Sequence, residues 1–209
     1  MELIFQGQRL ELMAERAVYW PEQQALLVAD LHWGKDATFR AHGIPVSRGQ
    51  LDDELKRLID LCHQVSAKHL YVLGDLCHAP EGLDLDTRAL IREACQQLPE
   101  RFLIEGNHDR RLRQVVESWG FSWLDEPSEV AGLTLRHHPG DGLYGHIHPT
   151  FRVKGPGEAI RLPCFVYDDE RLLLPAFTGF SGGPVQKPEA SQQVVVIAGS
   201  RLFKANRLS

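Results

Sequence analysis

Three short apolar segments, each ending in polar side chains, most strongly constrain what this chain can fold into. They have the length and composition of buried strands and span residues 26–30, 69–75 and 101–107. Two segments with helical character lie between them, at residues 50–66 and 84–98. This alternation of strands and helices predicts right-handed crossovers and a largely parallel sheet.

The segments outside this alternation differ in character. Residues 1–24 resemble a hairpin or short meander, residues 31–49 a polar loop, and residues 110–118 a further helix. After residue 120 the pattern favours strands joined by short turns, at 133–137, 142–146, 158–168, 171–177 and 193–204. We therefore expect an α/β sandwich with mixed sheets. Because residues 179–188 read as a loop and no linker is visible, we expect one domain over residues 1–209.

The composition excludes several classes of protein. Hydrophobic residues make up 43% and charged residues 24% of the chain, so it carries enough apolar surface to fold. Its longest apolar runs are about five residues, whereas a membrane span needs about 20. We see no secretory signal, and the 4 cysteines form no C-x-x-C pair. These features predict a cytoplasmic protein without a membrane partner.

The charge balance limits how a nucleic acid can be bound. The chain has 23 Lys and Arg against 28 Asp and Glu, which gives a net charge of −5. A protein that binds nucleic acid by bulk electrostatics would be basic. A phosphate-bearing substrate must therefore be held by a local feature, and the 10 histidines make a metal site a candidate.

The polar ends of the three predicted strands should lie close together. In a parallel sheet the carboxyl ends of the strands share one edge, where α/β proteins place their sites. The side chains expected there are Asp30, His32, Asp75, Asn107 and His108. Carboxylates, imidazoles and an amide oxygen together suit Mn, Fe, Zn or Co. Asp75 ends the central strand and is the natural bridge between two ions about 3.5–4 Å apart.

Two later motifs add histidines to this set. His137 and His138 precede Pro139, and His146 and His148 lie two residues apart after Gly145. On a strand, His146 and His148 would point to the same face, whereas a tight loop would let them reach neighbouring ions. Seven candidate ligands are what a bridged pair of ions needs.

Taken in order, five motifs resemble the calcineurin-like binuclear metallophosphoesterase superfamily. They are D-x-H at 30–32, G-D-x-x-H at 74–78, G-N-H-D at 106–109, H-x-P at 137–139 and G-H-x-H at 145–148. The resemblance implies an αββα sandwich of two mixed sheets flanked by helices. It also implies two ion sites that share Asp75: one formed by Asp30, His32, Asp75 and His148, the other by Asp75, Asn107, His137 and His146. His138 is the alternative to His137.

A narrower resemblance covers nearly the whole chain. Five short stretches resemble the ligase-associated DNA damage response endonucleases, the PdeM branch. They are Asp30-Leu31-His32-Trp33-Gly34-Lys35, Phe39-Arg40, Gly43-Ile44-Pro45, Leu174-Pro175-Ala176-Phe177 and Gly182-Gly183. This implies a bacterial Mn²⁺-dependent enzyme that cleaves DNA phosphodiesters in repair. It also implies a functional association with a DNA ligase, a helicase and an exonuclease.

The implied chemistry assigns roles to the remaining polar side chains. Two ions would activate a water that attacks phosphorus in line with the leaving sugar oxygen. Asn107 would bind a metal and a phosphoryl oxygen, and His108 would stabilise or protonate the leaving oxygen. Asp109 would hold His108 in the required tautomer, and His78 is a further candidate near the leaving group.

Basic and aromatic side chains near these motifs are candidates for binding DNA. Lys35, Arg40, Arg110 and Arg111 would contact flanking phosphates, although a solvated helix face explains the arginines equally well. Trp33 and Phe39 would stack unpaired bases, which predicts single-stranded DNA, or they belong to the core.

Two other functions compete with a DNA phosphodiesterase. A phosphomonoesterase acting on a nucleotide, phosphoprotein or small metabolite would use the same ions. A non-catalytic metal-binding interaction module is the third hypothesis. The motifs span about 120 of the 209 residues, which leaves little chain for a cap over the site. This favours an open site and a polymeric substrate.

Overall fold

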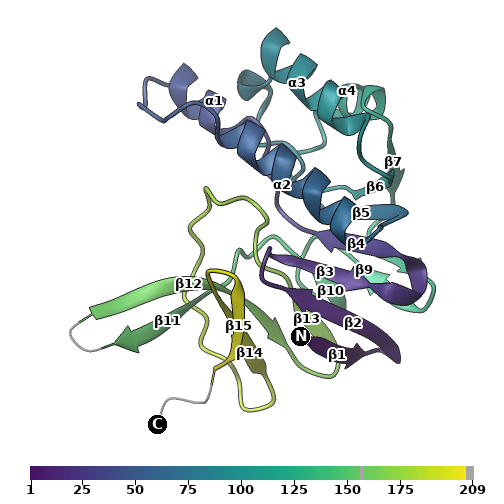
Figure 1. Cartoon of the computed structure of the whole chain (residues 1–209), viewed down its shortest axis with the longest axis vertical. Helices are drawn as coiled ribbons and strands as arrows, with labels where there is room; N and C mark the ends of the chain where they lie inside the picture. The colour runs from purple at the N-terminus through teal and green to yellow at the C-terminus, as the bar shows by residue number, and fades with distance from the viewer. Residues whose placement is uncertain (156–157, 206–209) are drawn as a thin grey trace.

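Two β-sheets pack face to face, and the helices cover the outer face of one of them (Figure 1). The computed structural model describes residues 1–155 and 158–205. The helices are α1 (Lys35–Ala41), α2 (Gln50–Gln64), α3 (Leu85–Cys95) and α4 (Arg113–Ser118), with short 3₁₀ helices η1 (Pro21–Gln23) and η2 (Pro80–Gly82). The α/β class with two mixed sheets is confirmed.

The first sheet contains seven strands in the order of the chain. They are β1 (Glu2–Phe5), β2 (Gln8–Met13), β3 (Ala17–Trp20), β4 (Ala25–Val28), β5 (His69–Leu73), β6 (Glu100–Ile104) and β7 (Phe121–Leu124). Strands β1 to β4 form an antiparallel meander, and β4 to β7 are parallel. The predicted parallel core is therefore present, preceded by the predicted meander.

Alternate side chains of the first sheet enter two different cores. Leu26 and Val28 of β4 belong to the core under the helices, whereas Ala25 and Leu27 belong to the core between the sheets. Successive side chains of a strand point to opposite faces, so a strand covered on both sides is apolar throughout. Helix α2 buries Leu51, Leu55, Leu58, Leu61 and Cys62 against this sheet. Burying each such leucine contributes roughly 1.5–3 kcal/mol.

The second sheet has the strand order β15-β14-β12-β13-β10-β9-β8, and β11 pairs with β12 beside this path. Its strands are β8 (Ser128–Val130), β9 (Leu133–Leu135), β10 (Gly142–Tyr144), β11 (Thr150–Gly155), β12 (Glu158–Tyr167), β13 (Arg171–Leu173), β14 (Gln193–Ala198) and β15 (Arg201–Lys204). Strand β10 runs parallel to β9 and β13, and the other pairings are antiparallel.

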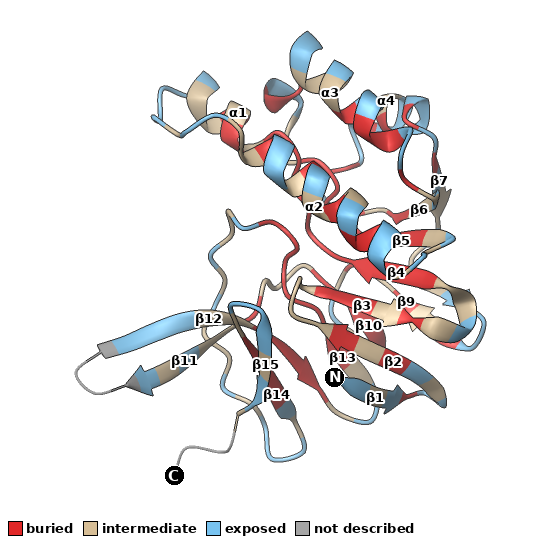
Figure 2. Cartoon of the chain, in the orientation of Figure 1, coloured by how far each residue is buried: buried red, intermediate tan, exposed pale blue. Residues whose placement is uncertain are grey.

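The outer face of the second sheet differs from the four-layer arrangement that the resemblance implied. Its apolar cluster consists of strand and loop residues such as Tyr144, Val166 and Val196, with Phe151 and Val153 of β11 packed against it. Among the described residues no helix contributes to this cluster. Figure 2 shows the exposed β11–β12 ribbon extending to one side of this sheet, away from the helices.

Two segments differ from the expected elements. Residues 31–49 contain α1, although only a loop was expected there. The buried side chains of α1 include Asp36 and Thr38, so this short helix has no apolar periodicity to signal it. Residues 193–204 form the hairpin β14–β15 rather than one strand, with Gly199 at a φ of 60° in its turn. Among the described residues, no helix combines the length and apolar character needed to cross a membrane.

Candidate metal centre

The ends of the parallel strands lie side by side, as predicted. Val28 of β4 pairs with Val72 of β5, and Leu73 pairs with Ile104 of β6. The backbone pairing continues beyond the strands, because Asp30 N–H donates to the Gly74 carbonyl at 3.1 Å. The His32 N–H likewise donates to the Asp75 carbonyl at 2.9 Å. This pairing brings the D-x-H and G-D-x-x-H motifs to one edge of the sheet.

Five candidate ligands have backbone conformations that L-residues rarely adopt. Their φ values are 54° for Asp30, 50° for His32, 52° for Asp75, 68° for His146 and 51° for His148. Such left-handed conformations are uncommon outside glycine and cluster at functional sites. With these φ values, His146 and His148 do not lie on a regular strand. Of the two arrangements expected for this pair, the tight loop is therefore the one observed.

Two buried carboxylates lie at the centre of the site. Asp30 is 0% and Asp75 3% exposed. The His146 N–H donates to Asp30 Oδ2 at 2.8 Å, and the His108 N–H donates to Asp75 Oδ1 at 3.1 Å. Within residues 1–155 and 158–205, only histidines form ion-pair contacts with these two carboxylates. Buried carboxylates without a lysine or arginine partner require another source of positive charge.

The first group of candidate ligands surrounds Asp30. His148 Nε2 lies 3.4 Å from Asp30 Oδ1, and His32 Nε2 lies 3.2 Å from His148 Nε2. The same His32 nitrogen is 3.8 Å from Asp75 Oδ2. Asp30, His32 and His148 each offer one donor atom, and these atoms lie within 4.8 Å of one another. Burial, followed by the nearby His148, lowers the pKa of His32, so its ring is held neutral and able to bind a cation.

The second group surrounds His137, which is 0% exposed. Its Nδ1–H donates to the Leu73 carbonyl at 2.9 Å, so a neutral ring carries its lone pair on Nε2. This Nε2 faces Asn107 Oδ1 at 3.2 Å, His146 Nδ1 at 3.0 Å and Asp75 Oδ1 at 3.6 Å. A lone pair that faces two acceptor oxygens and a second imidazole nitrogen is the arrangement expected around a cation. The residues present therefore fit a divalent metal ion.

His138 has a different environment from its neighbour. Its Nδ1 lies 2.8 Å from Glu126 Oε2, and its side chain is 42% exposed. The Glu126 carboxylate also accepts the N–H groups of His137 at 3.0 Å and His138 at 2.7 Å. His138 still lies in one group of candidate donors with His137 and His146. The geometry favours His137 as the ligand and His138 as the partner of Glu126, a residue that the motifs did not single out.

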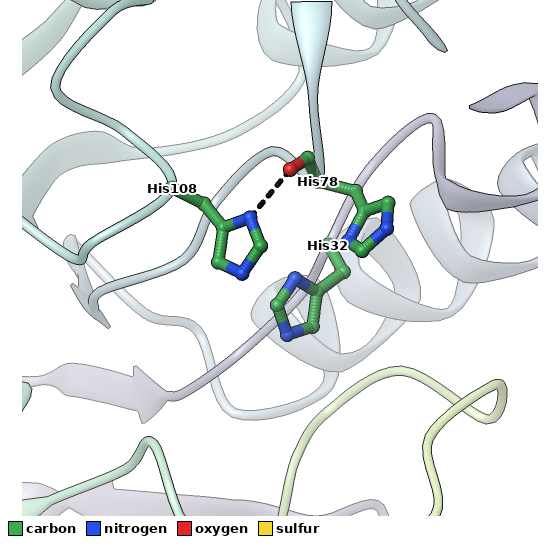
Figure 3. Close-up of side chains that lie close together, drawn as sticks. All are labelled: His32, His78 and His108. Atoms are coloured by element: carbon green, nitrogen blue, oxygen red, sulfur yellow. Dashed lines mark hydrogen bonds between the residues drawn. The ribbon is translucent and has the colours of Figure 1, made fainter.

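A third cluster joins His32 to the two histidines outside the ligand set (Figure 3). His108 Nδ1 donates to the His78 carbonyl at 2.6 Å, which directs its Nε2 towards Asp75 Oδ2 at 3.9 Å. The rings of His78 and His108 stack with centroids 5.2 Å apart. Burial, followed by the nearby Lys35, lowers the pKa of His78 to about 4. A neutral His78 packs against His108 without repelling it.

The role predicted for Asp109 is wrong. Asp109 is 0% exposed, and its carboxylate accepts the N–H groups of Gly106 at 3.0 Å and Cys77 at 3.4 Å. It therefore ties the loop after β6 to the loop after β5 instead of contacting the His108 ring. The His78 carbonyl sets the His108 tautomer in its place. Burial, assisted by the charge of Asp75, raises the pKa of Asp109 to about 7.

The four predicted phosphate-binding side chains have different surroundings. The Lys35 amine lies 5.7 Å from the Phe180 ring centroid, and burial lowers its pKa. Arg40 pairs with Asp36 of its own helix at 2.8 Å, and exposed Arg110 pairs with Glu105 at 3.3 Å. Arg111 is exposed and forms no ion pair among the residues described. Of these four, Lys35 lies beside the candidate ligands, because it lines a small hollow with His32.

Of the two aromatic candidates, Trp33 belongs to the core. It is 1% exposed and packs edge-on against Trp119 and Phe121, so it is not available for base stacking. Phe39 is half-buried, with its ring centroid 6.0 Å from that of His78 and 5.3 Å from that of Phe180. The sequence analysis did not single out Phe180; the signal that could have indicated it was the nearby Gly182-Gly183 pair. A side chain at Gly183 would overlap the His148 carbonyl, so this loop packs directly on the centre.

A cavity opens beside this aromatic pair. Its volume is about 340 Å³, and it is lined by Gln50, Asp53, Glu54, Arg57, Gly179 and Phe180. The smaller hollow that contains Lys35 and His32 shares Gln50, Glu54 and Phe180 with it. The cavity therefore adjoins the candidate ligands on the side of α2.

The fold and the site together define a two-sheet α/β protein that gathers candidate metal ligands at the carboxyl ends of its parallel strands. The crystal structure of the Pseudomonas putida nuclease MPE aligns with a TM-score of 0.83 and 32% identity, covering 98% of this chain and 99% of that one. The chain belongs to the family of this nuclease, which confirms the predicted resemblance to PdeM-like metallophosphoesterases.

Other comparisons add little to this assignment. The protein of unknown function AQ665 from Aquifex aeolicus aligns with a TM-score of 0.41 and 16% identity, over 59% of this chain and 77% of that one. No protein-family model and no curated protein matches the chain.

Proposed function

We propose that this protein is a metal-dependent, specifically Mn²⁺-dependent, phosphodiesterase that cleaves DNA internally and acts in DNA repair. The observation that carries the proposal is the set of two acceptor oxygens and a second imidazole nitrogen around His137 Nε2, next to two buried carboxylates that have no lysine or arginine partner among the described residues. The similarity to a P. putida nuclease supports nucleic acid as the substrate. A cytoplasmic location and an association with a ligase, a helicase and an exonuclease stay predictions from the sequence.

Seven side chains would hold two ions. Asp30, His32 and His148 belong to the first site, and Asn107, His137 and His146 to the second. Asp75 would serve both, since its two oxygens approach His32 on one side and His137 on the other. Two such ions supply Lewis-acid activation of a water molecule and neutralise charge on the phosphate.

The other polar side chains would act on the substrate. His108 is fixed by the His78 carbonyl, and its Nε2 points to the same region as the carboxylate of Asp75. When protonated, this nitrogen donates a hydrogen bond or its proton to the leaving oxygen. Asn107 is exposed, so its amide N–H₂ would be able to bind a phosphoryl oxygen, while its Oδ1, which faces His137 Nε2, would bind the ion.

The neighbouring aromatic pair favours an unpaired strand. Phe39 and Phe180 lie next to His78 and Lys35, so a base flanking the scissile phosphate would find a stacking surface there. The Lys35 amine would bind the adjoining phosphate. The half-buried Phe39 and Phe180 rings would stack on unpaired bases, which favours an extended single strand over a duplex.

A direct test uses circular single-stranded DNA, which has no ends for an exonuclease. The protein is incubated with this DNA, with bis(4-nitrophenyl) phosphate and with 4-nitrophenyl phosphate, each with Mn²⁺ or with EDTA. We expect linear products from the circle and hydrolysis of the diester, both abolished by EDTA. Asp75→Asn keeps the shape of the side chain and removes its charge, so it serves as the matched inactive control.

The competing functions give other patterns. Hydrolysis of the monoester without cleavage of DNA would support a phosphomonoesterase and overturn the proposal. Failure to hydrolyse any of the three, with Mn²⁺ bound, would support a non-catalytic module.

A further inference from the structure

The β11–β12 ribbon extends away from the rest of the second sheet (Figures 1 and 2). Its register is antiparallel, with Phe151 opposite Leu162 and Val153 opposite Ile160. Phe151, Val153 and Leu162 pack against the apolar cluster on the outer face of the sheet. Directly opposite residues of an antiparallel pair share one face, so this is the inner face of the ribbon.

The other face of the ribbon carries positive charge. Arg152 lies directly opposite Arg161, and Lys154 follows on the same face of β11. All three are exposed. Opposite residues of an antiparallel pair have Cβ atoms about 4.5–5.5 Å apart, and like charges at such positions destabilise the pair. The solvent-facing side of the ribbon thus contains two arginines that repel each other.

Nothing in the described parts of the chain neutralises this face. Among the side chains that the structure describes, which exclude those of residues 155–158 and 206–209, no carboxylate forms an ion pair with Arg152, Lys154 or Arg161. The chain as a whole has a net charge of −5, so an unpaired group of cations here is not a consequence of a basic composition. An external polyanion would turn the repulsion into attraction.

A groove runs beside this basic face. Its volume is about 510 Å³, and it lies between β11 and the segment 185–192. Arg152, Lys154 and Lys187 line it, with Glu189 as the acidic residue. The groove therefore adds a fourth cation to the three on the ribbon.

The strand that lines this groove starts close to a candidate metal ligand. Strand β11 starts at Thr150, two residues after His148, and the Thr150 hydroxyl donates to the Gly183 carbonyl at 3.2 Å. The Gln186 N–H donates to the Thr150 carbonyl at 2.7 Å, which fixes the segment beside the strand. The six residues of β11 reach about 20 Å at about 3.4 Å per residue, a length that spans several phosphates.

We propose that the basic face of β11–β12, with Lys187, binds the sugar-phosphate backbone of DNA on one side of the cleaved bond. This proposal rests on the proposed function. Arginine suits the phosphate because its planar guanidinium forms paired hydrogen bonds with two oxygens. Contacts of this kind position the strand and carry no sequence information, so cleavage is independent of sequence.

The test compares two double variants. Arg152→Gln/Arg161→Gln removes the opposed pair. Lys68→Gln/Arg92→Gln is the matched control, because it removes two exposed cations elsewhere, one in the loop before β5 and one on α3. Affinity is measured with metal-loaded protein by the anisotropy of a labelled single-stranded phosphorothioate 20-mer at several salt concentrations. A gel checks that the oligonucleotide stays intact. The hydrolysis of bis(4-nitrophenyl) phosphate is measured in parallel.

We expect the ribbon variant to bind about 25-fold more weakly at 0.1 M salt and equally at 1 M salt. This follows from a loss of about 0.7 in the salt slope for each phosphate contact. Hydrolysis of the small diester should be unchanged, because it is too short to reach the ribbon. The melting temperature should stay the same or rise, since the repulsion between the arginines is relieved, whereas a structural role would lower it.

Several outcomes separate this proposal from the proposed function. An unchanged affinity and salt slope in the ribbon variant, while DNA is still cleaved, would overturn the ribbon proposal alone. An equal loss in the control variant would also overturn it. If binding depends on the ribbon but no DNA is cleaved, the proposed function fails, and only the DNA-binding role of the ribbon is supported.

Discussion

Gly74 offers the sharpest test of the second ligand group. Its φ is +79°, and a Cβ built on it would overlap Nδ1 and Cγ of the His137 ring and lie 2.8 Å from His137 Cβ. Gly74→Ala therefore has two effects. The left-handed conformation costs about 1–2 kcal/mol for an L-residue. The overlap also forces the His137 ring away from the Leu73 carbonyl that fixes its tautomer.

Gly43→Ala separates these two effects. Gly43 has nearly the same φ, +76°, but nothing lies within 4 Å of the position its Cβ would occupy. We expect Gly43→Ala to lower the melting temperature by about 2–8 °C, from about 1–2 kcal/mol in a chain of this size, and to leave the centre intact. Gly74→Ala should lose at least as much stability, because it also breaks a buried hydrogen bond worth about 1 kcal/mol.

The distinguishing readout is the metal content. We expect Gly74→Ala to retain about one Mn²⁺ per chain where the wild type and Gly43→Ala retain two, measured by mass spectrometry of the metal after gel filtration. Its turnover should fall by about 100-fold, the usual cost of misplacing a site group by about 1 Å. Full metal content and full activity in Gly74→Ala would show that His137 is not a ligand, because its ring cannot keep the present position beside a Cβ.

Three further predictions test individual side chains. His137→Ala should lose one of the two ions whereas His138→Ala keeps both, because His138 is held by Glu126; the same metal analysis decides, and the opposite pattern would exchange their roles. His108→Ala should keep both ions and slow DNA cleavage by about 100-fold or more. It should slow the hydrolysis of bis(4-nitrophenyl) phosphate much less, because nitrophenolate leaves without protonation. Equal losses of rate on both substrates would contradict proton donation by His108. Phe180→Ala should raise KM for single-stranded DNA and leave that for the small diester unchanged, and a change in kcat on both would point to distortion of the centre instead.

The sequence was sufficient to predict the features that depend on hydrophobic periodicity and on the residues at strand ends. Asp30, Asp75 and Asn107 follow β4, β5 and β6, and parallel register alone brings such residues to one edge. The sequence did not predict α1, because its buried side chains include polar Asp36 and Thr38 rather than an apolar stripe. Helix formation there is supported by local contacts, the Asp36–Arg40 pair and the Thr38 hydroxyl bond to the Gly34 carbonyl.

Contacts between side chains and backbone atoms were the other feature of the site that the sequence could not predict. Asp109 was expected to orient His108 because carboxylates commonly orient imidazoles, yet its oxygens bind the amides of Gly106 and Cys77. A carbonyl performs the orienting role instead, and every residue has a carbonyl, so no side-chain pattern could have indicated His78 for it. Phe180 was missed for a related reason: its place beside Phe39 depends on the loop that connects β13 and β14 of the second sheet.

The segment from Leu73, the last residue of β5, to His78 connects these observations, and it gives a physical reason for the G-D-x-x-H spacing. The Leu73 carbonyl fixes the His137 tautomer, and Gly74 leaves room for the same ring. The Asp75 carboxylate lies between the two ligand groups, and the His78 carbonyl fixes His108. Because the carbonyl of residue 78 survives in an alanine variant, His78→Ala should keep His108 oriented. A loss of activity in that variant would then report the His78 ring itself rather than the position of His108.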